Sequence, residues 1–129
     1  MKNLLLVLGI LVSTLTFGHE GHNNAPGSFK SIHGGTVQNG KELNLEVMVN
    51  GKELTVYPTS HESKDIPSNE VKLTAQAKPK KGKPYEVKLA PAKGGYSAIV
   101  DLQGSNRLPV EITVTSKGKT DKFVVQVEE

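Results

Sequence analysis

Apolar and polar residues alternate along most of this chain, which is the pattern of strands that bury one face and expose the other. The clearest run covers residues 43–49, in which every second residue is Leu or Val. Further runs with this period lie at residues 54–56, 71–75, 87–89, 96–102, 108–114 and 123–127. The pair Asn50-Gly51 separates the first two runs, and an Asn-Gly pair between alternating segments predicts a tight hairpin.

Turn-forming residues separate the other runs, and no stretch has a helical period. Clusters of Gly, Pro, Ser, Asn or Lys occur at residues 67–69, 81–82, 94–95, 104–106 and 117–119. About seven short strands at regular spacing predict an antiparallel β-sandwich. We therefore predict an all-β domain over residues 32–129 with immunoglobulin-like topology, although the disulfide and tryptophan of antibody domains are absent.

The first 18 residues have a different character. Lys2 precedes an almost entirely apolar run at residues 4–15, and Thr16 and Gly18 are small enough to flank a cleavage site. This is the pattern of a secretory signal peptide over residues 1–18. The apolar run is shorter than the roughly 20 residues that span a membrane. The pattern predicts a periplasmic or secreted protein with no membrane insertion after cleavage; the alternative is an uncleaved N-terminal anchor.

Charge and composition exclude several function classes. The formal net charge is +3, and the one lysine cluster, residues 78–83, is interrupted by Pro and Gly and has no aromatic run beside it. A nucleic-acid surface would combine a basic face with stacking aromatics, so we predict a solvated loop and no nucleic-acid partner. There is no cysteine or Gly-rich phosphate loop, and "HEGH" is one residue short of the zinc-protease motif. We therefore predict that the protein is not an enzyme.

The histidines are the remaining candidates for chemistry. Residues 19–31 are rich in Gly, Asn, His, Pro and Ser, which predicts a flexible arm. Cleavage after Gly18 would make His19 the N-terminus, and its α-amine and imidazole together would form a chelate suited to tetragonal Cu(II). Glu20 or His22 could add a third ligand. Cleavage one residue later would place His22 third, which is also a good Cu(II) or Ni(II) chelate; the alternative is a solvated tail without metal.

Several short motifs follow the arm in a characteristic order. They are His33-Gly34-Gly35, Glu46 within an apolar strand, Leu54-Thr55-Val56-Tyr57, His61, Pro67 and "LAPAKGGYSAIVDL". Together they resemble the small "HGG" β-domain of exported bacterial proteins. That domain is found at the front of periplasmic adaptor subunits of heavy-metal efflux pumps and also as stand-alone proteins.

The resemblance implies that His33 and His61 are metal ligands of the domain and that an efflux-pump component is a partner. Two departures matter. Ser60 stands where the family often has an acidic residue, and the helical hairpin and barrel of an adaptor are missing. The chain would therefore be a free-standing relative of the adaptor domain.

Strand register limits which histidines can share a metal. In a plain meander over residues 35–59, the hairpin would pair Val47 with Leu54. His33 and His61 would then lie about six residues apart along the sheet, or roughly 20 Å. They could share a metal only if the segment carrying His33 crossed to the other sheet.

The arm has no such limit, because a flexible chain can fold back at low loop-closure cost. Our preferred site combines His19 and His22 with at least one domain histidine, His33 before His61. Imidazole without thiols favours Cu(II) or Zn(II) over Cu(I). The sequence thus predicts an exported metal carrier or buffer, with copper ahead of zinc and nickel. The alternative is an immunoglobulin-like interaction module with no physiological metal.

Overall fold

The computed structural model describes residues 30–129 of the chain. The predicted signal peptide and residues 19–29 of the predicted arm lie outside this range, so both stay predictions. No helix among residues 30–129 is long and apolar enough to span a membrane.

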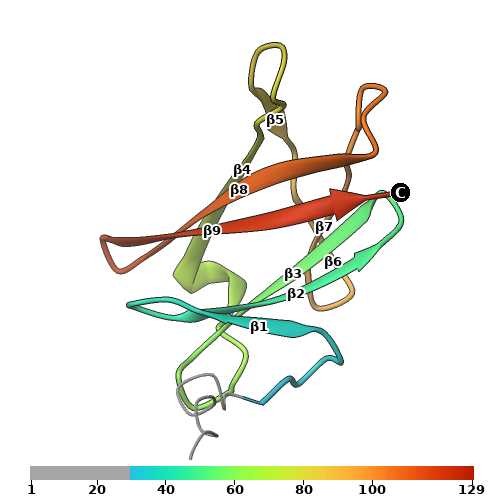
Figure 1. Cartoon of the computed structure of the whole chain (residues 1–129). Coiled ribbons are helices and arrows are strands. Elements are labelled where there is room, and N and C mark those ends of the chain that lie inside the picture. The colour runs from blue at the N-terminus through green and yellow to red at the C-terminus, as the bar shows by residue number, and fades with distance from the viewer. Residues whose placement is uncertain (1–29) are drawn as a thin grey trace, which may run out of the picture.

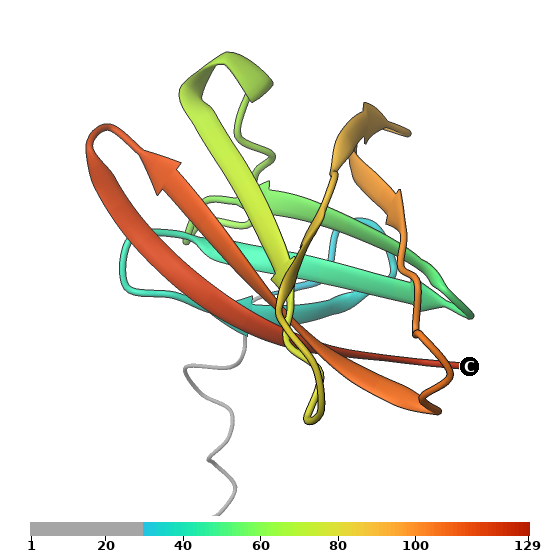
Figure 2. The same cartoon turned by 90° about the horizontal axis from the view of Figure 1, so that it is seen from above.

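In the part of the chain that the structure describes, nine strands form two antiparallel sheets. In chain order they are β1 (Thr36–Asn39), β2 (Asn44–Asn50), β3 (Glu53–Thr59), β4 (Val71–Ala77), β5 (Tyr85–Val87), β6 (Ala90–Ala92), β7 (Gly95–Ile99), β8 (Arg107–Ser116) and β9 (Lys119–Glu128), with a short 3-10 helix, η2 (Ser68–Glu70), before β4. One sheet has the order β1-β2-β3-β7-β6, and the other has the order β5-β4-β8-β9. Figure 1 shows the two sheets as separate layers, and Figure 2 shows the same layers from above.

The predicted β-sandwich is confirmed, and its strand order is that of the immunoglobulin fold. The order β2-β3-β7-β6 matches strands A-B-E-D, and β5-β4-β8-β9 matches C′-C-F-G. β1 is an additional strand beside the first of these. The expected number of about seven was too low because two short strands, β1 and β6, have no alternating run in the sequence, while the run at residues 87–89 corresponds to β5, which ends at Val87. β5 pairs with β4 in one sheet and β6 pairs with β7 in the other, and three-residue strands are too short to show a period.

The β2–β3 hairpin forms as predicted, but its register was wrong by two residues. Asn50 pairs with Glu53, so the turn residues are Gly51 and Lys52, and Val47 pairs with Val56. Gly51 has a φ of 60°, and a glycine at the first turn position is what a type II′ turn needs. Because the error is an even number of residues, it leaves every side chain on the predicted face.

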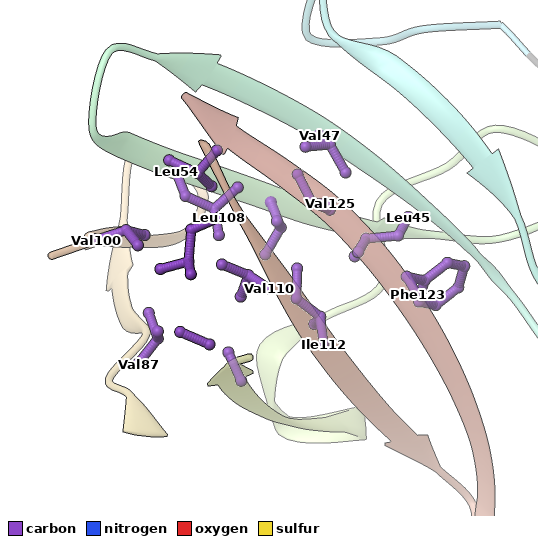
Figure 3. Close-up of a cluster of buried hydrophobic side chains, with 14 of the residues drawn as sticks. Leu45, Val47, Leu54, Val87, Val100, Leu108, Val110, Ile112, Phe123 and Val125 are labelled. Atoms are coloured by element: carbon purple, nitrogen blue, oxygen red, sulfur yellow. The ribbon is translucent and has the colours of Figure 1, made fainter. Parts of the chain in front are cut away.

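The core lies between the two sheets and is built from the inward-facing residue of each alternating pair. Figure 3 shows this cluster, in which Leu45 and Val47 of β2 pack with residues of the opposite sheet such as Val110 and Phe123. These side chains are at most 7% exposed. Burial of apolar area of this kind provides the main stabilisation of a domain that has no disulfide.

A buried carboxylate joins the edge of one sheet to the other. Asp121 of β9 accepts hydrogen bonds from the backbone N–H groups of Lys41 (3.1 Å), Glu42 (2.7 Å) and Leu43 (3.0 Å), in the turn between β1 and β2. Gly40 packs so closely on this group that a Cβ there would lie 2.7 Å from Asp121 Oδ2. Asp121 therefore fixes the β1–β2 turn against the second sheet.

We expect Asp121→Ala to lower the free energy of unfolding by roughly 2–4 kcal/mol, because it leaves three backbone donors at a largely buried site without an acceptor. The measurement is urea denaturation at pH 7. Asp101→Ala is the matched control, since Asp101 accepts one exposed backbone hydrogen bond, from Gln103 at 2.8 Å. The free energy of unfolding of Asp101→Ala should fall by less than about 1 kcal/mol. Equal losses in the two variants would contradict the assigned role of Asp121.

Candidate functional site

The outer face of the five-stranded sheet is covered where β2 and β3 run side by side. Glu46 and Tyr57 are direct partners across these strands, so their side chains share the face away from the core. Both residues are buried, Glu46 completely and Tyr57 to 6% exposure. Residues 31–35, which precede β1, provide the cover over Glu46.

The Glu46 carboxylate organises this covering segment. It accepts hydrogen bonds from the backbone N–H groups of Ile32 (2.9 Å), His33 (2.8 Å) and Gly35 (2.7 Å) and from Ser31 Oγ (2.7 Å). Four donors therefore converge on one buried carboxylate and hold residues 31–35 in a single conformation.

The protonation of Glu46 reflects these donors. Burial by itself would raise the pKa of Glu46. The hydrogen bonds from Gly35, Ser31, Ile32 and His33 act in the opposite direction, and together they hold the pKa below its ordinary value of 4.5. Glu46 is therefore ionised at neutral pH, and its charge is balanced by hydrogen-bond donors.

The two glycines of the "HGG" motif have different roles. Gly34 has a φ of 88°, which other residues rarely adopt, and its N–H donates to Ser31 Oγ at 2.8 Å. Gly35 packs against β2, where a Cβ would lie 2.5 Å from the Val47 carbonyl oxygen. One glycine thus provides the turn, and the other lets the backbone approach the sheet closely enough to reach Glu46.

His33 precedes these glycines, and its side chain lies on the outer face of the sheet. Its ring stacks on Tyr57, with 3.7 Å between the ring centroids and 10° between the planes. Its Nε2 lies 2.8 Å from Asp65 Oδ1. The His33 side chain is 23% exposed and that of Asp65 is 50% exposed, so the pair faces solvent at the rim of the covered face.

Asp65 is positioned by the chain that follows β3. It forms an isolated β-bridge with Thr59, and the next residue, Ile66, donates its N–H to the carbonyl oxygen of Pro58 at 3.1 Å. These backbone bonds fold the segment after β3 back onto that strand. The carboxylate therefore reaches His33 from a position 32 residues away in sequence.

The structure places His61 differently. Its ring is exposed, and Nε2 lies 3.1 Å from the carbonyl oxygen of Gly40. The meander of β1, β2 and β3 is present, so the segment after His33 does not cross to the second sheet. Residues 30–129 contain no group of three or more His, Cys, Asp or Glu side chains arranged to hold a metal ion. His19 and His22 lie outside the described residues.

Two important residues of this site had weak signals or none in the sequence. Glu46 was noticed only as part of a resemblance, although an acid at an otherwise apolar strand position is a usable signal for a buried carboxylate. Asp65 had no signal, because its partner His33 lies on a separate segment and no local spacing connects them.

We expect Glu46→Gln to destabilise the protein by roughly 2–4 kcal/mol at pH 7, because an amide cannot accept from all four donors. The native pKa of Glu46 is lowered, so its contribution is complete above about pH 4.5 and is lost as the pH falls through the native pKa. The stability difference between wild type and variant should therefore shrink on acidification. Urea denaturation at pH 7 and at pH 3 measures it.

Glu111→Gln is the control for that measurement. The pKa of Glu111 is also lowered, mainly by the hydrogen bond from Lys78, but Glu111 and Lys78 form a surface ion pair. Glu111→Gln should therefore lower the free energy of unfolding at pH 7 much less than Glu46→Gln does. A pH-independent loss in Glu46→Gln would show that the charge of Glu46 does not stabilise residues 31–35.

Comparison with known proteins extends the picture of the fold. No protein-family model matches the chain, and no curated protein matches it either. Among solved structures, it is similar to a DUF4426 family protein from Pseudomonas aeruginosa PAO1, with a TM-score of 0.52 and 19% sequence identity over 73% of this chain and 96% of that chain. At this identity the likeness shows a shared β-fold and nothing about function.

Proposed function

We propose that this chain is an exported, periplasmic metal-binding protein that carries or buffers a divalent metal, with Cu(II) preferred over Zn(II) and Ni(II). The observation that carries the proposal is the pair of His33 and Asp65, an imidazole and a carboxylate held together at a solvent-facing rim. Both are common ligands of divalent transition metals. The proposed role is binding and delivery, without catalysis.

His33 is rigid enough to act as an anchoring ligand. Stacking on Tyr57 fixes the plane of its ring, and the bond from its backbone N–H to Glu46 fixes the start of its side chain. A ligand that is already ordered loses little conformational entropy when metal binds.

The separation of the two ligand atoms is that of a direct hydrogen bond, because His33 Nε2 and Asp65 Oδ1 are 2.8 Å apart. A metal would take the place of the proton between them, so the two side chains would have to open slightly to coordinate it. The preference for Cu(II) rests on the chelate that the α-amine and imidazole of His19 would form.

Two ligands do not complete a site, and the predicted arm would supply the others. His22 precedes His33 by 11 positions, a chain length over which closing a loop costs little. His19 and His22 would add nitrogen ligands, for a mixed nitrogen and oxygen set. We leave His61 out of this set because its Nε2 already faces the carbonyl oxygen of Gly40. The "HGG" resemblance implies an efflux-pump component as the partner to which the metal would be delivered.

One observation favours a second candidate function, an interaction module. Ile99 is 72% exposed and Met48 is 37% exposed, and both lie on the outer face of the five-stranded sheet. A protein partner that covered this face would bury both side chains, which is favourable. This candidate requires no metal, so metal titration separates the two.

We expect the exported protein, with its N-terminus confirmed by mass spectrometry, to bind one Cu(II) with a Kd below about 1 μM in competition with a chromophoric chelator. His33→Ala should weaken binding at least tenfold, and the double substitution His19→Ala, His22→Ala should do the same, because each removes nitrogen ligands. His61→Ala is the matched control and should retain the wild-type Kd. Binding that is equal in all variants would contradict the proposed site and favour the interaction module.

Asp65→Asn tests the carboxylate separately. An amide keeps the size and the hydrogen bond but removes the charge, so we expect the Cu(II) Kd to rise roughly 10- to 100-fold. Stability in urea should change little, because Asp65 is half-exposed. An unchanged Kd in this variant would show that Asp65 neither binds the metal nor orients His33 toward it.

A further inference from the structure

A basic hollow lies at the end of the sandwich opposite His33. β4 begins beside residues 60–67, which carry Asp65, and ends at Ala77, where the lysine-rich loop 78–84 begins. Figure 1 shows this loop and loop 100–106 at the top of the molecule, while residues 31–35 and 60–67 lie at the bottom. The hollow is formed by the two loops together with β8 and β9, and its polar lining consists of Lys80, Lys81, Gln103, Ser105, Arg107 and Gln126.

The charged residues that line the hollow are all positive. Among the described residues that line the hollow, three are cations and none is an acid. Within residues 30–129, neither Lys80 nor Lys81 has an acidic partner. The ion pair of Arg107 is long, with 3.9 Å between its Nε and Glu128 Oε2, and both side chains are largely exposed. Lys78 of the same loop is different, because its Nζ lies 3.0 Å from Glu111 Oε1.

The two walls of the hollow are tied to the domain and to each other. The N–H of Lys78 donates to the carbonyl oxygen of Pro109 at 2.9 Å, and that of Ser105 donates to Leu102 at 2.9 Å. The hydroxyl of Tyr85, which follows the lysine loop, donates to the carbonyl oxygen of Asp101 at the start of the other loop. The cations are therefore carried on connected walls, and their mutual repulsion is relieved when an anion enters.

We propose that this hollow is a binding site for phosphate groups. Ammonium groups and a guanidinium provide charge-assisted donors, and the Gln and Ser side chains provide neutral donors to the remaining oxygens. Several separated cations fit a polyphosphate or an array of phosphates better than one small anion. None of the lining residues within positions 30–129 is aromatic, which argues against stacking of nucleobases. The proposal is independent of the metal site.

The test is titration of the full exported protein with inorganic tripolyphosphate, by calorimetry at low ionic strength with chelator present. The double substitution Lys80→Gln, Lys81→Gln should weaken binding at least tenfold, and Arg107→Gln should weaken it severalfold. The control, Lys41→Gln with Lys72→Gln, removes the same charge from exposed positions outside the hollow and should change the Kd less than twofold. Binding should weaken as salt rises, because the contacts are solvent-accessible.

A second arm distinguishes the source of the phosphate. Cosedimentation with phosphatidylglycerol vesicles, compared with phosphatidylcholine vesicles, tests for lipid headgroups with the same variants. Binding that depends on Lys80 and Lys81 but not on Lys41 and Lys72 supports the site. The probe that binds in this way identifies the source of the phosphate, either a free polyphosphate or a lipid headgroup. No binding to either probe, or binding that falls equally in both double variants, would overturn the proposal.

Discussion

The hydrogen bonds to the Glu46 carboxylate are the interaction on which the candidate site depends. A carboxylate on the outer face of β2 is stable there only because four donors of the preceding segment converge on it. Those donors in turn place His33 over Tyr57 and within 2.8 Å of Asp65. A buried charge that would otherwise destabilise the sheet thus orders the segment that carries the imidazole.

A second carboxylate, that of Asp121, has the same role. Asp121 accepts hydrogen bonds from three backbone N–H groups of the β1–β2 turn, as Glu46 accepts three from the segment before β1. β1 is a short edge strand with little apolar area of its own, and both of its ends are attached through carboxylates. In this domain, which has no disulfides, charge-assisted hydrogen bonds hold the irregular segments in place.

The two ends of the sandwich have opposite chemistry. Acidic and imidazole groups face solvent at the end where Asp65 and His33 meet, whereas lysines and Arg107 surround the hollow at the other end. The core of the sandwich separates the two ends by the length of β4, so a cation and an anion can be held without competing for the same side chains. This separation is why the metal proposal and the phosphate proposal can be tested independently.

The alternation of Leu and Val with polar residues by itself determined the longer strands, their faces and the sandwich, because period two forces one side of each strand into the core. The short strands β1 and β6 have no such alternation. The sequence also marked His33 and its glycines as unusual. Only the tertiary structure decided that Gly35 approaches β2, that Glu46 gathers the donors and that Asp65 partners His33. These pairs join segments 11 to 32 residues apart, and no local pattern records which segments meet once the sheets pack.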